Sequence, residues 1–451
     1  MSPADLTTKF FLAAAVILLA CRLVGALARW IGQPPVVGEM ITGVLLGPSL
    51  LGAVAPRIEG DLFPRALLPV IYVAGQLGLI ALMFQAGREL RGYLRPGLGR
   101  TAGLVSGVGV TVPLLCGTGL ALLASGRVAI FVPGVRTWVT AAFVGVTLAI
   151  TAFPMLARII VERGLSGTRF GSLALASGGI DDMAAWILLA GVLSLAAMNS
   201  WLVIKAVGGA VAFALVLLLV ARPLLARYLR PSLTPQAVFL ITMTLVLAGA
   251  WFTSFIGLYA VFGGFAVGLV MPPGLGQPAA QPAAGSSATA GGPMLSGRPA
   301  RPATPGEADL VGPAMDGVSR LLVPMFFTYS GLNTRFAVLG NPRVLLFSLA
   351  AIVVAVLSKG GACWLAARLA GEPRPVAARV AALMNARGLM QLIALNVGLQ
   401  AGIVSRELFT SLVLVALITT MMATPLLSWL EHRERAAAPV RRPAGMREAA
   451  T

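Results

Sequence analysis

Charged side chains are scarce in this chain of 451 residues, because Asp, Glu, Lys and Arg together make up only 11% of it. Soluble globular domains carry about 25% charged residues. With 58% hydrophobic residues as well, the composition excludes a soluble domain and indicates a membrane protein throughout. The net charge of +18 comes from Arg residues in short loops between apolar segments. Membrane topology therefore explains it, and we expect no nucleic-acid partner.

Metal-binding side chains are equally rare. The one histidine, His432, lies in the C-terminal tail, which excludes a histidine metal site or proton relay within the membrane. The three cysteines, Cys21, Cys116 and Cys363, lie in apolar segments without the spacing of metal ligands. Nothing in the sequence indicates an enzyme, and no cofactor is expected.

Apolar runs of membrane-spanning length recur along the chain and predict an all-α polytopic membrane protein. The first run is followed by Arg29 without a small-residue cleavage site, which favours a retained helix over a signal peptide. We expect about thirteen transmembrane helices, at residues 10–28, 36–54, 66–87, 101–124, 137–161, 170–197, 201–221, 236–252, 255–271, 317–333, 343–369, 376–402 and 407–430.

The distribution of Arg predicts the orientation of these spans. Alternate loops are rich in Arg, and by the positive-inside rule they face the cytoplasm. This places the N-terminus outside, the C-terminus in the cytoplasm, and the protein in the plasma (inner) membrane. The cytoplasmic group includes Arg88, Arg91, Arg95, Arg100, Arg158, Arg163, Arg169, Arg222, Arg227, Arg230, Arg368, Arg374, Arg379, Arg433 and Arg435.

Two segments outside the spans are predicted to lie in the cytoplasm. Residues 272–313 are rich in Pro, Gly, Ala and Ser, a composition that cannot bury a core, so we expect a disordered loop there. Residues 432–451 form a cytoplasmic tail with no room for a nucleotide-binding domain.

Two adjacent carboxylates, Asp181 and Asp182, lie within the apolar run 170–197. One Asp at the centre of a membrane helix costs roughly 2.5–3.5 kcal/mol, so the pair needs partners or water. Neighbouring helical residues point about 100° apart, so one carboxylate can take a cationic partner while the other lines a cavity. Alternatively, Gly178-Gly179 ends the helix and both Asp residues lie in a turn. A helix that ended at these glycines would leave an apolar segment after the turn that is short for a membrane span. We therefore favour a continuous helix that carries an ion site.

Two spans contain breaks at membrane depth. The first is at 151–154, where Pro154 lacks a backbone donor, and the second is at Asn385-Ala386-Arg387-Gly388. Broken helices in corresponding positions of two chain halves mark the substrate site of many secondary transporters. Lys359, about ten residues from the nearer charged end of its span, could snorkel or could pair with a carboxylate.

Several motifs together resemble the monovalent cation:proton antiporter-2 family of sodium/hydrogen exchanger domains. The resemblance covers nearly the whole membrane part, with the motifs in the expected order. They are residues 32–39 (GQPPVVGE), 45–50 (LLGPSL), 151–158 (TAFPMLAR), 180–182 (IDD), 326–332 (FFTYSGL) and 387–393 (RGLMQLI).

The resemblance implies an NhaA-like antiporter fold with inverted repeats and two crossing broken helices. It implies a scaffold or dimer part at about 10–88 and 236–333, and a mobile core at about 101–197 and 343–430. Residues 201–221 would link the two parts, and the protein would be a homodimer. The resemblance further implies an antiporter, which would exchange Na⁺ or K⁺ for H⁺ across the bilayer.

The family's site residues map onto this sequence one by one. Asp182 matches the principal ion-binding carboxylate, and Asp181 matches the carboxylate that pairs with a helix Lys, here Lys359. Both aspartates would bind Na⁺ or K⁺ transiently, because desolvation favours a neutralised carboxylate and makes cation and proton compete for it. The further site residues are Thr151 at the first break, Arg387 at the second, and Gln391, Asn385 and Ser330.

Three positions depart from the family pattern: Gln391 stands where Glu is common, Tyr259 where His is common, and Ser254 where an acidic residue is common. These changes put the family's pH behaviour in doubt for this chain. Two alternatives to a Na⁺/H⁺ exchanger stay open, a K⁺/H⁺ exchanger and a non-transporting ion or ligand sensor. A third alternative, an anion or organic-solute symporter, would require more polar residues at the breaks.

Overall fold

The computed structural model describes residues 1–93, 98–165, 167–196, 200–228, 234–272 and 311–437. Within these ranges every regular element is a helix, which confirms the predicted all-α class. The loop predicted at 272–313 lies outside the described residues except at its two ends. The predicted tail is described only as far as Ala437, the last residue of α18.

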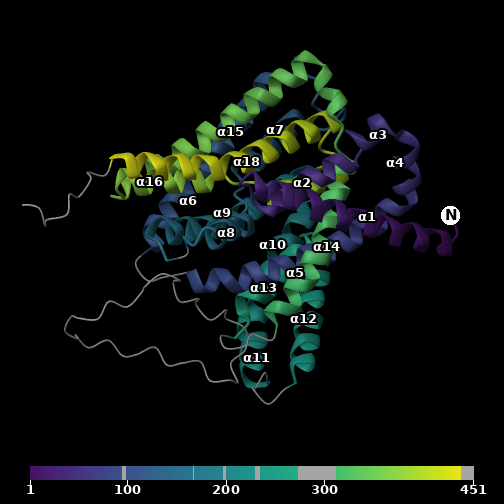
Figure 1. The fold of residues 1–451 in the computed structure, drawn as a ribbon. Helices are drawn as coiled ribbons and strands as arrows, with labels where there is room; N and C mark the ends of the chain where they lie inside the picture. The colour runs from purple at the N-terminus through teal and green to yellow at the C-terminus, as the bar shows by residue number, and fades with distance from the viewer. Residues whose placement is uncertain (94–97, 166, 197–199, 229–233, 273–310, 438–451) are drawn as a thin grey trace, which may run out of the picture. The chain divides into compact units, whose positions relative to one another are not determined.

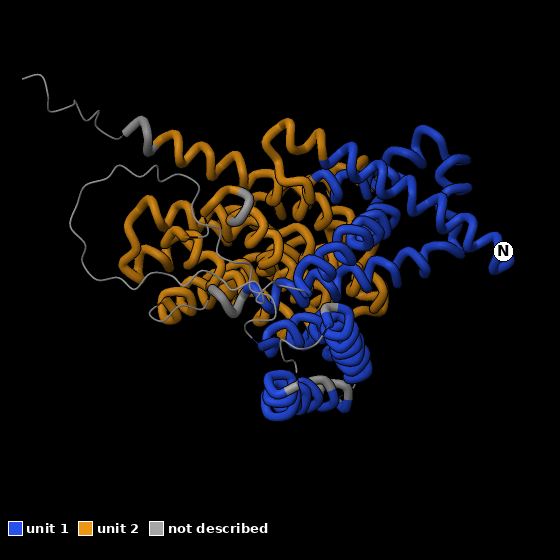
Figure 2. The backbone as a smooth tube through the Cα atoms, turned by 60° about the horizontal axis from the view of Figure 1, so that its bottom comes forward, with its two compact units in different colours: residues 1–25, 38–95, 190–337 blue, residues 26–37, 96–189, 338–451 orange. Residues whose placement is uncertain are grey.

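The chain divides into two compact units, which Figure 2 distinguishes by colour. Unit 1 comprises residues 1–25, 38–95 and 190–337, and unit 2 comprises residues 26–37, 96–189 and 338–451. Six sequence segments thus alternate between the units, three in each, so each unit is assembled from distant parts of the chain.

Unit 1 contains the helices of the N-terminal quarter and of the middle of the chain. Three of them, α1, α2 and η3, run across a boundary between the units. The helices are α1 (Pro3–Trp30), α2 (Pro35–Leu46), α3 (Leu51–Val54), α4 (Pro56–Leu62), η1 (Arg65–Leu67), α5 (Leu68–Tyr93), α10 (Ser200–Val216), η2 (Leu217–Ala221), α11 (Arg222–Tyr228), α12 (Pro235–Phe255), α13 (Ala260–Val270), α14 (Gly312–Leu332) and η3 (Phe336–Gly340).

Small residues allow the helices of unit 1 to approach closely. Helix α5 packs against both α13 and α14 (Figure 1). Helices α2 and α14 meet at Gly43 and Gly331, where a Cβ added to Gly331 would overlap the backbone carbonyl of Gly43. Glycine at such contacts is typical of membrane helices, in which close backbone approach replaces the hydrophobic driving force.

Unit 2 contains the helices that carry the predicted ion site. They are α6 (Gly99–Ala124), α7 (Thr137–Ala149), α8 (Phe153–Glu162), α9 (Arg169–Ala196), α15 (Pro342–Leu369), α16 (Arg374–Met384), α17 (Leu389–Gln400) and α18 (Arg406–Ala437). The last turns of α9 fall within unit 1.

Helix α15 is the centre of the packing in unit 2. It lies against α6, α16 and α18, and runs alongside α18 in Figure 1. Its start is fixed locally, because the Asn341 side chain accepts a hydrogen bond from Arg343 N and Pro342 occupies the first turn. In each of the segments 137–160 and 374–400, an 18-residue stretch is about nine-tenths buried, so most of α7, α8, α16 and α17 lies in the interior of the unit.

Eleven helical segments among the described residues are long and apolar enough to cross a membrane, which confirms a multi-pass membrane protein. The count of thirteen is not confirmed. The span expected at 255–271 is only an 11-residue helix, α13, because Gly257 adopts φ +87 and interrupts the chain after α12. The span expected at 317–333 is α14, which begins earlier and includes Asp316 and Arg320.

Candidate functional site

Two helices of unit 2 are broken where the sequence predicts. The first ends at Ala149, is non-helical at residues 150–152, and resumes at Phe153 as α8. Proline is tolerated in the first turn of a helix, where its missing N–H would have had no partner. Pro154 occupies that position in α8, so the helix restarts immediately before it and Thr151 is left in the gap.

The second break lies between α16 and α17, at residues 385–388. Gly388 adopts φ 58 and ψ −117, a backbone conformation that other residues rarely reach. The two breaks touch directly, because Ala152 N donates a hydrogen bond to Ala386 O at 3.2 Å. The predicted crossing of two broken helices is therefore present.

The two carboxylates lie on α9, which is helical through Gly178-Gly179 and continues to Ala196. The alternative in which these glycines end the helix is therefore wrong. Asp181 is fully buried and Asp182 is 2% exposed. Since adjacent helical residues diverge by about 100°, the two side chains have different surroundings.

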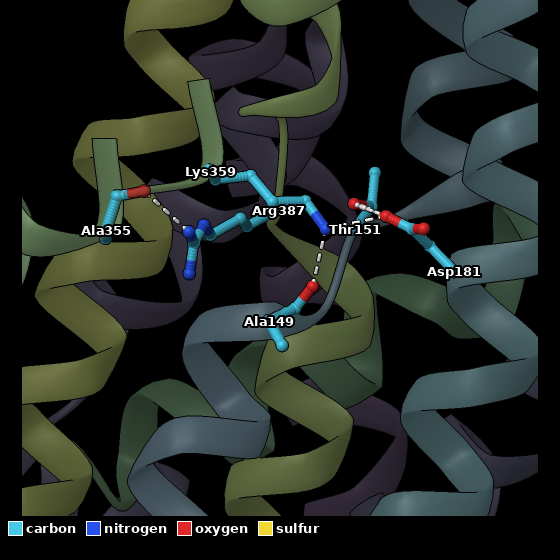
Figure 3. A network of polar contacts seen from close by, with 6 residues as sticks. All are labelled: Ala149, Thr151, Asp181, Ala355, Lys359 and Arg387. Carbon is cyan, nitrogen blue, oxygen red and sulfur yellow. Dashed lines mark hydrogen bonds and ion pairs between the residues drawn. The ribbon is translucent and has the colours of Figure 1, made fainter. Parts of the chain in front are cut away.

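Asp181 is held by a network that Figure 3 shows in full. Lys359 Nζ lies 2.6 Å from Asp181 Oδ2, with both side chains fully buried. The same amine donates to Ala149 O, 2.7 Å away, at the C-terminal end of α7. Thr151 Oγ1 donates to Asp181 Oδ2 at 2.8 Å. A cation at a helix C-terminus is favourable, so Lys359 stabilises both the carboxylate and the end of the half-helix.

Asp182 stands apart from this network. Its Oδ1 is buried and has no hydrogen-bond partner in the part of the chain that the structure describes. Ser177 Oγ, buried on α9 four residues before Asp181, likewise lacks a partner there. Asp181 Oδ1 has no partner there either, but Asp181 has Lys359 as its counter-charge. A buried carboxylate without a counter-charge is costly, so of the two aspartates Asp182 has more to gain from a proton or cation.

The predicted residues of the second break contact main-chain carbonyls. Arg387 is fully buried, and its Nη2 donates to Ala355 O at 2.8 Å. Asn385 Nδ2 donates to Ala381 O at 3.3 Å. Gln391 Nε2 donates to Leu412 O on α18 at 3.3 Å. Arg387 and Gln391 therefore donate to different helices, α15 and α18.

Ser330 is not among the residues gathered at the breaks. It lies on α14 in unit 1, where its backbone carbonyl accepts a hydrogen bond from Thr334 Oγ1 at 2.9 Å. Tyr259 and Ser254, two of the positions that depart from the family pattern, belong to unit 1 as well.

One buried charge was missed by the sequence analysis. Glu372 follows α15, its side chain is 1% exposed, and both of its oxygens accept hydrogen bonds from Arg169 at 2.8 Å. A lone acidic residue between Arg368 and Arg374 in an Arg-rich loop was the available signal. This pair joins the start of α9 to the end of α15.

Within the described ranges, no group of three or more His, Cys, Asp or Glu is placed to hold a metal ion.

A charged crossing of two broken helices, inside an all-helical multi-pass membrane protein, is an arrangement that secondary transporters use at their substrate sites. Within that class the chain belongs to the transmembrane sodium/hydrogen exchanger family, which matches residues 15–431.

Relatives within the family differ in length and in the cation named. The chain is 33% identical to the Na(+)/H(+) antiporter NhaS4 of Synechocystis sp., over 91% of this chain and 94% of that protein. It is 31% identical to Cation/H(+) antiporter 17 of Arabidopsis thaliana over 91% of this chain, but spans only 47% of that longer protein. The solved structure of the sodium proton antiporter MjNhaP1 from Methanocaldococcus jannaschii has the same fold. Its TM-score is 0.63 at 15% identity, over 94% of this chain and 97% of that one.

Proposed function

We propose that the protein exchanges a monovalent cation, Na⁺ or K⁺, for protons by alternating access, with Asp182 as the group that binds them in turn. The observation that carries this proposal is the asymmetry of the two aspartates. Asp181 Oδ2 is paired with Lys359 at 2.6 Å and accepts a hydrogen bond from Thr151, whereas Asp182 forms no ion pair among the described residues. Oδ1 is buried without a partner there in both carboxylates. One carboxylate is fixed and the other is available.

Competition at one carboxylate is sufficient for exchange. Burial disfavours the ionised form of Asp182, so the group is stabilised by either a proton or a cation. A proton leaves as the cation binds, and the reverse exchange on the other side returns the site to its first state. Lys359 and Thr151 hold Asp181 in place, and Lys359 also balances the negative end of α7.

The division into units supports a moving core. The predicted ion site, apart from Ser330, lies in unit 2, so we propose that unit 2 moves and unit 1 is the scaffold through which two copies form a homodimer. Helix α10, within the linking segment expected at 201–221, would connect scaffold and core. From the Arg distribution we further propose an inner-membrane protein with its N-terminus outside and its C-terminus in the cytoplasm.

Relatives carry names that include a Na(+)/H(+) antiporter and a K(+)/H(+) antiporter, so both Na⁺ and K⁺ are candidates for this chain. A non-transporting sensor on the same fold is the second candidate function. It is disfavoured because a sensor has no need to keep Asp181, Asp182 and Lys359 together, and all three are present and buried.

Purified protein in proteoliposomes with an internal pH-sensitive dye tests the proposal. We expect proton movement on addition of Na⁺ or K⁺, and none on addition of choline, with empty liposomes as the control. Adding Na⁺, K⁺ and Li⁺ separately identifies the cation. Folded protein that binds a cation but moves no protons with any of the three would favour the sensor.

A further inference from the structure

Arginines gather at one end of unit 2, where the turn between α15 and α16 meets the start of α9. Residues 163–171 and 364–384 contain five arginines and a single carboxylate, Glu372. One of the five, Arg163, donates to Ser428 Oγ at 2.8 Å. The other four, which we call the arginine cluster, are Arg169, Arg368, Arg374 and Arg379. Four positive charges and one negative charge leave this part of the unit strongly basic.

Glu372 orients two arginines of the cluster at once. Arg169 Nε and Nη2 donate to its two carboxylate oxygens, each at 2.8 Å. Arg368 Nη1 donates to its backbone carbonyl at 2.6 Å. The glutamate side chain is 1% exposed, but that of Arg169 is 70% exposed. An arginine has five N–H donors, so Arg169 is held by two of them and presents the rest of its guanidinium at the surface.

The other two arginines lie close to the same contact. The guanidinium carbon of Arg379 lies 4.8 Å from the centre of the Phe170 ring, a cation–π arrangement that fixes its position. Phe170 directly follows Arg169 and is buried. Arg374 is exposed at the first residue of α16, two residues beyond Glu372. Each arginine of the cluster therefore contacts Glu372 or Phe170, or lies within two residues of Glu372.

Exposed apolar side chains precede the cluster on α15. Trp364 is 41% exposed, Leu365 49% and Leu369 71%. Trp364 lies four residues before Arg368, and therefore on the same face of the helix, one turn further from its end. Aromatic and apolar residues followed by basic residues are typical of a membrane helix where it enters the headgroup region. The end of α15 thus offers an apolar surface directly beside a basic one.

We propose that the arginine cluster binds the headgroup of an anionic phospholipid, whose acyl chains lie along Trp364, Leu365 and Leu369. Basic pockets between membrane helices bind anionic headgroups, and the planar guanidinium matches the geometry of phosphate oxygens. Glu372 offsets one positive charge of the cluster, and the lipid phosphate offsets another. The exposed apolar side chains favour a lipid over a soluble phosphate compound, which would leave them uncovered.

A lipid bound here would connect two helices of the ion site. Arg169 is the first residue of α9, which carries Asp181, and Arg368 lies in the last turn of α15, which carries Lys359. The headgroup would add a second link between these helix ends, beside the existing contact of Arg169 with Glu372. Anionic lipid should therefore raise the melting temperature of the protein as well as bind to it. Neither effect depends on transport.

Titration of the purified protein with phosphatidylglycerol in detergent, followed by native mass spectrometry, tests the proposal. One arginine near an anionic headgroup contributes roughly a fivefold gain in affinity. Arg374→Gln should therefore weaken binding about fivefold, and Arg368→Gln combined with Arg374→Gln about 25-fold. The rise in melting temperature on adding this lipid should be largely lost in the double variant. Phosphatidylcholine with the same acyl chains should bind less tightly and should not distinguish the proteins.

Arg343→Gln is the matched control, because Arg343 is exposed at the other end of α15 and is the only charged residue of that helix before Lys359. It should leave the affinity for phosphatidylglycerol unchanged. Glycerol 3-phosphate has the phosphate without the acyl chains, and should not raise the melting temperature.

Three results would overturn the inference. They are equal weakening by Arg343→Gln and the cluster variants, wild-type affinity in the double variant, and equal binding of phosphatidylcholine. Stabilisation by glycerol 3-phosphate as large as that by the lipid would instead assign the cluster to a soluble phosphate compound. Arg374→Gln changes an exposed residue, so it provides the test by itself if the double variant does not fold.

Discussion

Ala152 donates its backbone N–H to the carbonyl of Ala386 at 3.2 Å, so the two broken helices are joined through their main chains. Thr151 precedes the donor residue and Arg387 follows the acceptor residue. The Thr151 hydroxyl that binds Asp181 and the Arg387 guanidinium that binds Ala355 O therefore belong to residues beside this hydrogen bond, one at each break.

The first prediction concerns Asp182. Asp182→Asn should abolish exchange of every cation, because the amide can neither take up a proton nor offer a charged ligand. The protein should remain folded, since a neutral amide is cheaper to bury than a carboxylate. Cation-driven proton flux in proteoliposomes and the apparent melting temperature measure the two expectations.

Asp61→Asn is the matched control, because it makes the same chemical change at an exposed position of unit 1. It should retain wild-type flux. Substantial exchange in the Asp182→Asn protein would move the competing site to another residue, and Asp181 would be the next candidate.

The breaks were predictable from the sequence because their causes are local. Pro154 has no backbone donor, and Gly388 adopts a positive φ that few other residues tolerate. The continuation of α9 through Gly178-Gly179 was also predictable, because the apolar residues after these glycines are too few to cross the bilayer by themselves. Helix α13 was not, because the turn at Gly257 divides a continuous apolar run that pattern alone assigns to one span.

The contacts that position the charges could not be read from spacing. Lys359 reaches Ala149 O across 210 residues of sequence, and Arg387 reaches Ala355 O across 32. A sequence does not show which backbone carbonyl accepts a side-chain hydrogen bond, because every residue has one. The resemblance supplied the pairing of Asp181 with Lys359. It did not indicate that Glu372 is buried, nor that the Gln391 side chain donates a hydrogen bond to α18.

A second prediction concerns the contact of α2 with α14 in unit 1. Gly331→Ala places a methyl group against the carbonyl of Gly43, and the backbones must separate. We expect a loss of about 3 kcal/mol in the free energy of unfolding, within the range for overpacked interiors or slightly above it.

Gly317→Ala on the same helix is the control, because nothing lies within 4 Å of its added Cβ. Alanine is favoured over glycine in a helix by roughly 0.5–1 kcal/mol, so this variant should be equally or more stable than wild type. Thermal unfolding in detergent compares the stabilities of the Gly331→Ala and Gly317→Ala proteins. Equal stabilities would show that α2 and α14 can separate without cost.

A third prediction concerns the pair of Arg169 and Glu372. The two partners differ in exposure, with 70% of the Arg169 side chain and 1% of the Glu372 side chain exposed. Arg169→Gln leaves a buried carboxylate without its partner, whereas Glu372→Gln leaves an arginine that water can solvate. Arg169→Gln should therefore lower the melting temperature more than Glu372→Gln does.

The charge swap Arg169→Glu with Glu372→Arg provides the check on this prediction. It should recover little stability, because the buried position would then hold the larger side chain. Equal losses in the two single variants would mean that Glu372 finds other donors once Arg169 is gone.

The last prediction concerns the coupling of Asp181 to Lys359. Both side chains are fully buried and their charged atoms lie 2.6 Å apart. Removing one partner of a buried pair typically costs about 3–5 kcal/mol, because the other charge is stranded. Asp181→Asn and Lys359→Gln should therefore each lower stability by an amount in this range, and Lys359→Gln should also free the carbonyl of Ala149.

The double variant should recover much of the loss, since no buried charge is left unmatched. The excess over additivity in the free energy of unfolding measures the coupling. Voltage-dependent flux of the same proteins tests whether Lys359 carries a proton in the cycle. If it does, the double variant still exchanges but moves less net charge per turnover. Strict additivity of the two single losses would contradict a direct pair, and the asymmetry that assigns exchange to Asp182 would lose its physical basis.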